Sequence, residues 1–295
     1  MEKLPKVAIL LAVFEPNEYL ITQIKSLESQ IGVELHFYIG DDGTSQNKLR
    51  PYKDYFPEKH QFYQFDRVGH GQNFMKLLAA SADEDYYAFA DQDDVWLENK
   101  LMKHIEVLKN HKNSIAGSHS NSALLINDKV LEKKSRCFEH TISQLITENC
   151  VQGCTLVINK KARDAIVSAT PDYVRWHDWW IGLVLVSVGK LFLIPGVDTH
   201  YRIHHKNAIG QPSFLNRLKN SMIKKPGILL KQGKDLRDCF GVVMQEDEYS
   251  ELITWINRWD KNFFGRVFAG LFDQKRRRTL FSDLGQRFFS MLRKP

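Results

Sequence analysis

The sequence predicts an α/β protein whose mostly parallel central sheet is flanked by helices. Apolar runs of strand length alternate along most of the chain with segments whose apolar residues recur at helical spacing, which is the pattern of β-α-β units. The first run, residues 6–13, is almost wholly apolar, as expected of a strand buried on both faces. Polar residues directly follow several of these runs, and in a doubly wound sheet such positions meet at one edge, where ligands bind.

Strands and helices are expected to alternate in the following order. Strands are predicted at residues 6–13, 35–40, 62–65, 86–90, 123–127, 149–158 and 191–195. Helices are predicted from Pro16 with Leu20, Ile24, Leu27 and Ile31 on one face, through Met75 and Leu78, from Leu97 to Leu108, and at residues 162–169. Gly153 interrupts one predicted strand, at a point where a ligand can approach the backbone closely.

Three acids lie between the predicted strand at residues 86–90 and the next helix. Asp91, Asp93 and Asp94 are therefore expected at the carboxyl end of a buried strand. Carboxylates crowded in this way repel each other unless a cation holds them, and hard oxygen ligands suit Mg²⁺ or Mn²⁺. One acid could instead cap the following helix, which would leave two acids unexplained.

Candidate ligand-binding residues also stand at the ends of the other predicted strands. They are Phe14 and Glu15, Asp41 and Asp42, and Asn73 at the end of the loop that begins at Gly69. The P-loop signature is absent, and Gly69-x-Gly71 lacks the third glycine of the dinucleotide fingerprint. A nucleotide whose diphosphate is neutralised by a metal on Asp93 is therefore expected at this edge.

A second unusual cluster, Arg175-Trp176-His177-Asp178-Trp179-Trp180, places an acid among three tryptophans. The rings could belong to the core, or they could stack on sugar rings. An acid beside apolar rings tends to have a raised pKa, which suits a general base. Further along, His204 and His205 are either ordinary loop residues or, with Asp93, ligands of Mn²⁺.

Composition and charge place the chain among globular proteins. Its 295 residues are 43% hydrophobic and 26% charged, with a formal net charge of +6. Without a signal peptide or an apolar run of membrane-spanning length, the protein is expected in the cytoplasm. The cysteines (Cys137, Cys150, Cys154 and Cys239) show neither zinc-site spacing nor disulfide-scaffold density, so they are interpreted as small apolar residues.

The basic charge is concentrated in the C-terminal segment. Residues 213–295 contain 17 Lys and Arg against 9 Asp and Glu. Two phenylalanine-rich helices are predicted on either side of the basic stretch Lys275–Arg278. Such helices could lie on the inner face of an anionic membrane or pack on the rest of the protein. Nucleic-acid binding is not expected, because the aromatic residues recur at helical spacing rather than between arginines on a sheet.

Seven motifs occur together in an order that resembles glycosyltransferase family 2, and in particular its rhamnosyltransferase and O-antigen or capsule branch. They are Ala12–Glu15, Asp41–Ser45, the glycine-rich loop ending at Asn73, Asp91–Trp96, Gly153–Thr155, His177–Trp180 and Tyr201–His204. The resemblance covers about residues 5–210. It implies a GT-A fold and inverting sugar transfer from a nucleotide-diphosphate sugar, such as dTDP-rhamnose or a UDP-hexose, to a glycan acceptor, often on polyprenyl diphosphate.

The resemblance also implies residue roles. Nucleotide-sugar contacts fall on Ala12, Phe14, Glu15, Asp41, Asp42, Asn73, Asp91 and Gln92. Acceptor or sugar contacts fall on Gly153, Cys154, Trp179 and Trp180. Asp93 and His204 would be the ligands of Mn²⁺ or Mg²⁺. Asp178 would be the catalytic base. The chain departs from the family pattern at Glu15, at Asn121 and at His177, the last in place of the usual glutamate.

The predicted organisation is a catalytic domain at residues 1–212 and a basic amphipathic helical extension at residues 213–295. Two other functions are compatible with parts of the sequence. A sugar-phosphate nucleotidyltransferase also uses acids and a metal, but it would want a basic glycine-rich loop near the N-terminus, which residues 12–15 do not offer. A non-catalytic protein that binds nucleic acid or membrane would rely on the basic segment alone.

Overall fold

The computed structural model describes residues 3–131, 140–204 and 226–260. Their strands are β1 (Lys6–Val13), β2 (Glu34–Asp41), β3 (His60–Gln64), β4 (Tyr86–Asp91), β5 (Val95–Trp96), β6 (Ala116–Ile126), β7 (Lys129–Leu131), β8 (Val157–Asn159) and β9 (Lys190–Arg202). Their α-helices are α1 (Tyr19–Glu28), α2 (Gln46–Leu49), α3 (His70–Ala80), α4 (Lys100–Leu108), α5 (Ile142–Leu145), α6 (Lys160–Ser168), α7 (His177–Val188), α9 (Pro226–Phe240) and α10 (Glu246–Trp259). The predicted α/β class is confirmed.

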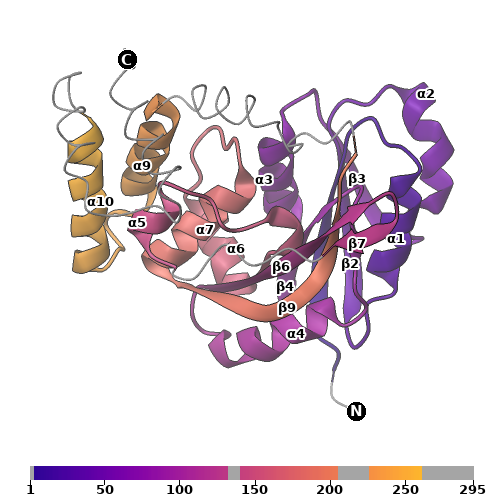
Figure 1. Cartoon of the computed structure of the whole chain (residues 1–295), viewed down its shortest axis with the longest axis horizontal. Coiled ribbons are helices and arrows are strands. Elements are labelled where there is room, and N and C mark those ends of the chain that lie inside the picture. Colours follow the sequence, from indigo (N-terminus) through magenta and orange to yellow (C-terminus); the bar gives the residue numbers. More distant parts are fainter. Residues whose placement is uncertain (1–2, 132–139, 205–225, 261–295) are drawn as a thin grey trace. The chain divides into compact units, whose positions relative to one another are not determined.

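The strands form one mixed sheet in the order β3-β2-β1-β4-β8-β6-β9-β5, and β7 pairs with β6. Strands β2, β3, β4, β6, β7 and β9 are labelled in Figure 1. The first four strands of this order are parallel, whereas β8 runs antiparallel to both of its neighbours. Asp41 of β2 lies opposite Val13 of β1 and Gln64 of β3, and Asp91 of β4 lies opposite Ala12. The carboxyl ends of the four parallel strands therefore meet at one edge, as predicted.

Helices cover both faces of this sheet. Alternate residues of β1, from Val7 to Val13, belong to one core cluster with apolar residues of α1 and α4. Helix α3 packs on β1 and β2, and it lies on the opposite face, because Phe37 and Ile39 of β2 belong to the cluster whereas Gly40 faces α3. A Cβ atom at Gly40 would lie 2.2 Å from the Asn73 Oδ1 atom. Glycine at this strand position therefore brings the first turn of α3 close to the strand ends.

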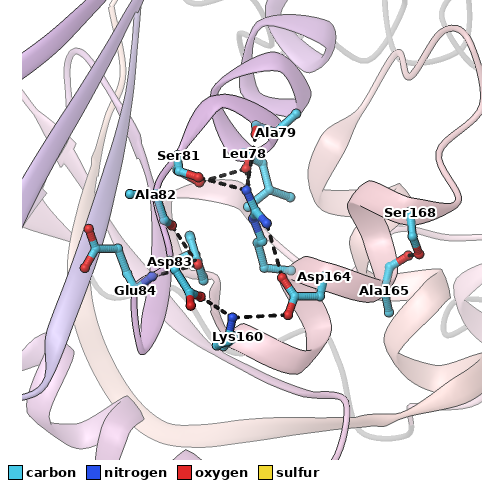
Figure 2. Close-up of polar contacts among 12 residues, drawn as sticks. Leu78, Ala79, Ser81, Ala82, Asp83, Glu84, Lys160, Asp164, Ala165 and Ser168 are labelled. Carbon is cyan, nitrogen blue, oxygen red and sulfur yellow. Dashed lines mark hydrogen bonds and ion pairs between the residues drawn. The ribbon is translucent and has the colours of Figure 1, made fainter.

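The far end of α3 is fixed by a cation from α6. The Arg163 guanidinium donates hydrogen bonds to backbone carbonyl oxygens of Leu78, Ala79 and Ser81, over distances of 2.8–3.2 Å (Figure 2). The last carbonyls of a helix lack intrahelical partners, and a cation there also interacts favourably with the helix dipole. The C-terminal end of α3 is thus held while its N-terminal end faces the carboxyl edge of the sheet.

Several predicted elements were wrong in extent or type. Residues 149–158 do not form one strand, because Gly153–Thr155 is a 3-10 turn and only Val157–Asn159 is strand. Helix α1 ends at Glu28, so Ile31 lies beyond it and is 54% exposed. Strand β9 extends from Lys190 to Arg202, well past the predicted end at residue 195.

The cysteine interpretation also needs correction. Cys150 is disulfide-bonded, although the spacing of the four cysteines suggested small apolar residues without covalent partners. Cys154 and Cys239 are free, as that interpretation expected. Sequence spacing alone does not reveal which cysteines come within bonding distance after folding.

Residue contacts divide the chain into two compact units. One is Met1–Phe138 with Cys150–His204, and the other is Glu139–Asn149 with His205–Pro295. In the second unit α9 and α10 pack together, and Leu236, Phe240, Leu252 and Ile256 are buried. The predicted domain boundary at residues 212 and 213, together with the basic stretch and its flanking helices, lies outside the described residues. Within the described ranges, no helix has the length and hydropathy needed to cross a bilayer.

Candidate functional site

The ends of β1 and β4 are joined by a side-chain amide. The Gln92 amide nitrogen donates to the Phe14 carbonyl oxygen, and its Oε1 atom accepts from the Phe14 backbone N–H, each over 2.9 Å. Glu15 follows with a positive φ of 43°, and its backbone N–H donates to the Thr44 hydroxyl at 2.9 Å. The loop after β1 is therefore held from two sides. The amide of Gln92 is occupied by this backbone contact, whereas the Phe14 ring stays half-buried.

The two acids after β2 hold the neighbouring loops. Asp41 is fully buried and accepts from the Thr44 backbone N–H at 3.0 Å, and burial raises the pKa of this carboxyl. Asp42 accepts from the backbone N–H groups of Val68 at 2.7 Å and Gly69 at 3.0 Å. These bonds fix the loop that leads into α3.

An exposed arginine covers the predicted base-binding ring. The Arg67 guanidinium carbon lies 4.6 Å from the centre of the Phe14 ring, a separation typical of cation–π contact. Arg67 also has a positive φ of 48°. Asn73, in contrast, is buried, and its side-chain amide donates to the Gly40 carbonyl oxygen at 2.8 Å. Asn73 thus fixes α3 against β2 and does not face solvent in this structure.

A histidine at the start of α3 pairs with the first acid of the cluster. His70 Nε2 lies 2.7 Å from Asp91 Oδ1. Burial lowers the pKa of His70, but the charge and hydrogen bond of Asp91 outweigh it, so the net pKa is raised. For Asp91 the balance is the reverse. Burial raises its pKa, but the charge and hydrogen bond of His70 outweigh this, so the net pKa is lowered. The two groups therefore favour a charged pair beside the carboxyl end of β4.

The predicted metal ligands also lie together, although they are far apart in the sequence. His204 Nε2 is 2.7 Å from Asp93 Oδ2, and both side chains are mostly buried. Burial and the charge of Asp91 raise the pKa of Asp93, while the hydrogen bond of His204 opposes this rise. A carboxylate oxygen beside an imidazole nitrogen is a donor set that Mn²⁺ accepts, and Mg²⁺ shares the preference for the carboxylate. The pair therefore fits a divalent cation.

A second group of potential ligands fits such a cation less well. Single donor atoms of Asp91, Asp94 and Cys154 lie within 4.8 Å of one another. However, Asp94 and Cys154 are buried, and burial together with the charge of Asp94 raises the pKa of the Cys154 thiol. A neutral thiol is a weak ligand, so Asp93 and His204 are the better-suited donors.

Helix α7 brings the predicted base to the same region. Asp178 lies in the first turn of α7, where a carboxylate is favoured, and its Oδ1 atom accepts from the Trp179 backbone N–H at 2.7 Å. The charge of Asp178 contributes to the raised pKa of His70, so the two side chains are neighbours. A Cβ atom at Gly153 would lie 2.5 Å from the His177 ring. The absence of a side chain at Gly153 therefore admits His177, next to Asp178.

The tryptophans beside Asp178 differ in exposure. Trp179 is 3% exposed and Trp180 is 2% exposed, so the structure favours the core role over sugar stacking for these two rings. Trp176 is half-buried, and its ring centre lies 5.5 Å from that of Trp179. Trp176 is thus the ring of the three that lies nearest the surface.

His177 should make the stability of the fold depend on pH. Burial and the charge of His70 lower its pKa to about 3, against about 6.5 in an unfolded chain. Between these values the unfolded chain binds a proton that the folded chain does not. The free energy of unfolding should therefore fall as the pH drops below about 6.5, by about 1.4 kcal/mol per pH unit for this group.

The substitution His177→Leu tests this, because leucine has a similar size and does not titrate. We expect urea unfolding between about pH 7.5 and 5 to show a shallower loss of stability in the variant than in the wild type. Other titrating groups contribute equally to both proteins. Identical slopes would show that His177 is not held neutral in the folded protein.

A parallel βαβ unit with clustered acids at its carboxyl edge, continued by an antiparallel strand, is the architecture of GT-A glycosyltransferases. Residues 8–163 match the family described as Glycosyl transferase family 2, and the chain belongs to this family. It is 24% identical over 214 residues to an uncharacterized glycosyltransferase of Nostoc sp., covering 68% of this chain and 66% of that protein, just under two thirds.

A further relative and a solved structure are also similar to this chain. The chain is 25% identical over 220 residues to the dTDP-rhamnosyl transferase RfbG of Shigella flexneri, covering 68% of this chain and 73% of RfbG. Its fold resembles that of S. aureus TarS (residues 1–349), crystallised in complex with UDP-GlcNAc, with a TM-score of 0.61 at 11% identity. That likeness covers 95% of this chain and 78% of the TarS chain. The predicted GT-A fold is thereby confirmed.

Three residues at the site were not predicted from the sequence. His70 pairs with Asp91, Arg67 covers Phe14, and Arg202 contacts the acidic cluster. His70 stood in the glycine-rich loop and Arg202 beside His204, so proximity to a motif was the available signal. Arg67 carried none, because its role depends on how the loop after β3 folds back over β1.

Proposed function

We propose that this protein transfers a sugar, with inversion, from a nucleotide-diphosphate sugar to a glycan acceptor in bacterial surface polysaccharide synthesis. The observation that carries the proposal is the pairing of Asp93 with His204 at 2.7 Å, at the carboxyl end of β4. Phe14 directly follows β1, and Asp178 lies in the first turn of α7. We assign the Phe14 ring to the donor base, the Asp93–His204 pair to the diphosphate and Asp178 to the acceptor hydroxyl.

In the proposed reaction the Asp178 carboxylate takes the proton of an acceptor hydroxyl. The hydroxyl oxygen then forms a bond to the anomeric carbon of the donor sugar, and the bond from that carbon to the diphosphate oxygen breaks. A positioned base of this kind contributes about 10²–10⁴-fold to the rate. Inversion follows because a single displacement forms no sugar–enzyme bond.

Asp93 and His204 would hold Mn²⁺ or Mg²⁺. When bound, such a cation neutralises charge on the departing diphosphate as a Lewis acid. His70, with its raised pKa, would add positive charge beside the same oxygens. Asp42 and Phe14 would contact the nucleobase, beside the Arg67 guanidinium that lies over the Phe14 ring.

The donor is proposed to be dTDP-rhamnose or a UDP-hexose. RfbG supports the first by its name, and the TarS complex with UDP-GlcNAc supports the second. The acceptor is proposed to be a glycan on polyprenyl diphosphate. The protein would then work in the cytoplasm at the inner face of the membrane, with the basic segment after residue 212 contacting anionic lipid.

The test is nucleoside diphosphate release from a panel of UDP-, dTDP- and GDP-sugars without added acceptor, because slow hydrolysis substitutes for transfer. We expect turnover of one donor with Mn²⁺ or Mg²⁺ and its loss when a chelator is added. Turnover that survives the chelator would overturn the metal assignment. No turnover, together with no donor binding by calorimetry, would overturn the proposed reaction.

A further inference from the structure

Arg202, the last residue of β9, joins three segments that are distant in the sequence. Its backbone N–H donates to Asp94 Oδ1 at 3.0 Å, and its side-chain Nε atom donates to the Asp93 carbonyl oxygen at 3.0 Å. A third bond runs from Nη1 to the Asp128 carboxylate at 2.9 Å. Arg202 itself is 7% exposed. One residue thus ties the acidic turn after β4 to the end of β9 and to the β6–β7 hairpin.

The guanidinium is also stacked on an aromatic ring that touches His204. Its central carbon lies 4.3 Å from the centre of the Tyr19 ring, and the Tyr19 and His204 rings are 5.3 Å apart between centres. Tyr19 is the first residue of α1. The Arg202 side chain and the His204 ring therefore both pack against the Tyr19 ring.

These contacts bear directly on the Asp93–His204 pair. Asp93 and His204 are 111 positions apart in the sequence. The Arg202 side chain holds the backbone carbonyl of Asp93, and His204 follows Arg202 by two residues. The bond from the Arg202 backbone N–H to Asp94 fixes the end of β9 against the turn that contains Asp93 and Asp94. The Nε bond to the Asp93 carbonyl sets the rotation of that turn, and with it the direction of the Asp93 side chain.

We propose that Arg202 is a positioning residue that holds Asp93 and His204 together so that both can ligate one divalent cation. The inference rests on the proposed function, because it presumes that this pair takes a cation. The Arg202 side chain offers no acceptor atom, so it would not ligate the metal. Its effect is to orient two ligands, as outer-shell partners commonly do.

The contact pattern requires a guanidinium rather than any cation. Its donors project in different directions within one plane, so Nε reaches Asp93 while Nη1 reaches Asp128. A lysine ammonium is a single point on a flexible stem. Lysine would keep the positive charge, but its chain has a methylene group where arginine has Nε, so it could not donate to the Asp93 carbonyl oxygen with the same geometry.

The test uses the full chain with Arg202→Met, Arg202→Lys and, as a matched control, Asp128→Asn. Binding of Mn²⁺ is followed by electron paramagnetic resonance in the presence of UDP and, in parallel, dTDP. Thermal unfolding without metal reports on folding. Arg202→Lys is included because it should fold even if loss of the charge prevents Arg202→Met from folding.

We expect both Arg202 variants to bind Mn²⁺ about 10–100-fold more weakly than the wild type. Asp128→Asn should stay within about twofold, because it removes only an ion pair whose acid is 89% exposed. Wild-type affinity in a folded Arg202→Lys variant would overturn the positioning role alone. Absence of Mn²⁺ binding by the wild type with either nucleotide would overturn the proposed metal assignment and this inference together.

Discussion

Replacing Asp178 with asparagine should lower donor turnover by about 10²–10⁴-fold, the usual contribution of a positioned general base. The affinity for the nucleoside diphosphate should change little, because Asp178 belongs to the acceptor side of the proposed site. The measurement is steady-state release of nucleoside diphosphate, with and without acceptor, together with nucleotide binding by calorimetry.

Asparagine is a suitable substitution because it removes the base and spares the helix. The Asp178 Oδ1 atom accepts from the Trp179 backbone N–H at 2.7 Å, and an amide oxygen can accept the same bond. The first turn of α7 should therefore keep its structure. An amide nitrogen, unlike a carboxylate, cannot take a proton from a hydroxyl at neutral pH.

Asp172→Asn is the matched control. Asp172 lies on the exposed loop before α7, so the substitution removes the same charge from the same stretch of chain. We expect wild-type turnover in this control. If Asp178→Asn also kept more than about a tenth of wild-type turnover, the base would have to be another group.

The parallel part of the sheet and its acidic edge could be predicted because local sequence determines them. A strand covered on both faces has to be apolar throughout, and polar residues begin where the strand leaves the core. This placed Asp41 and Asp91 correctly at strand ends. It also brought Asp93 near a loop histidine, because the topology of an α/β sheet sends successive strand ends to the same edge.

Helix α7 could not be predicted in the same way. It carries apolar residues on all sides, from Ile181 to Val188, because it is buried nearly all round, and such a run has no helical period. Strand β9 was cut short for a related reason. Pro195 and Gly196 look like a strand end, yet the strand continues through them with shifts in its register to β6.

The contacts that organise the site depend on tertiary structure. His70 meets Asp91 across 21 positions, and Arg202 meets the Asp93 carbonyl across 109 positions. The sequence offered these residues beside recognisable motifs, but their partners are set by how α3 and β9 pack against β4. Gly153 shows the same limit, since the sequence did not reveal that the ring of His177 lies against its backbone.

Replacing Asp93 with asparagine should abolish metal-dependent turnover while leaving the metal-free protein at least as stable as the wild type. Burial and the charge of Asp91 raise the pKa of Asp93, which means that the folded protein holds this carboxylate at a cost when no cation is present. A neutral amide removes the repulsion and keeps the size of the side chain. It also removes the charge that the cation needs, so turnover should fall by at least about 10²-fold.

A loss of turnover without a loss of stability would distinguish a metal ligand from a residue that stabilises the fold. Thermal unfolding without metal should give an unchanged or higher midpoint for Asp93→Asn, and added Mn²⁺ with nucleotide should raise the midpoint of the wild type only. Glu98→Gln, an exposed acid five residues further along, is the control and should behave as the wild type in both assays. A large fall in the metal-free midpoint of Asp93→Asn would mean that its bond to His204 stabilises the fold. The metal site would then have to be sought at another group of side chains.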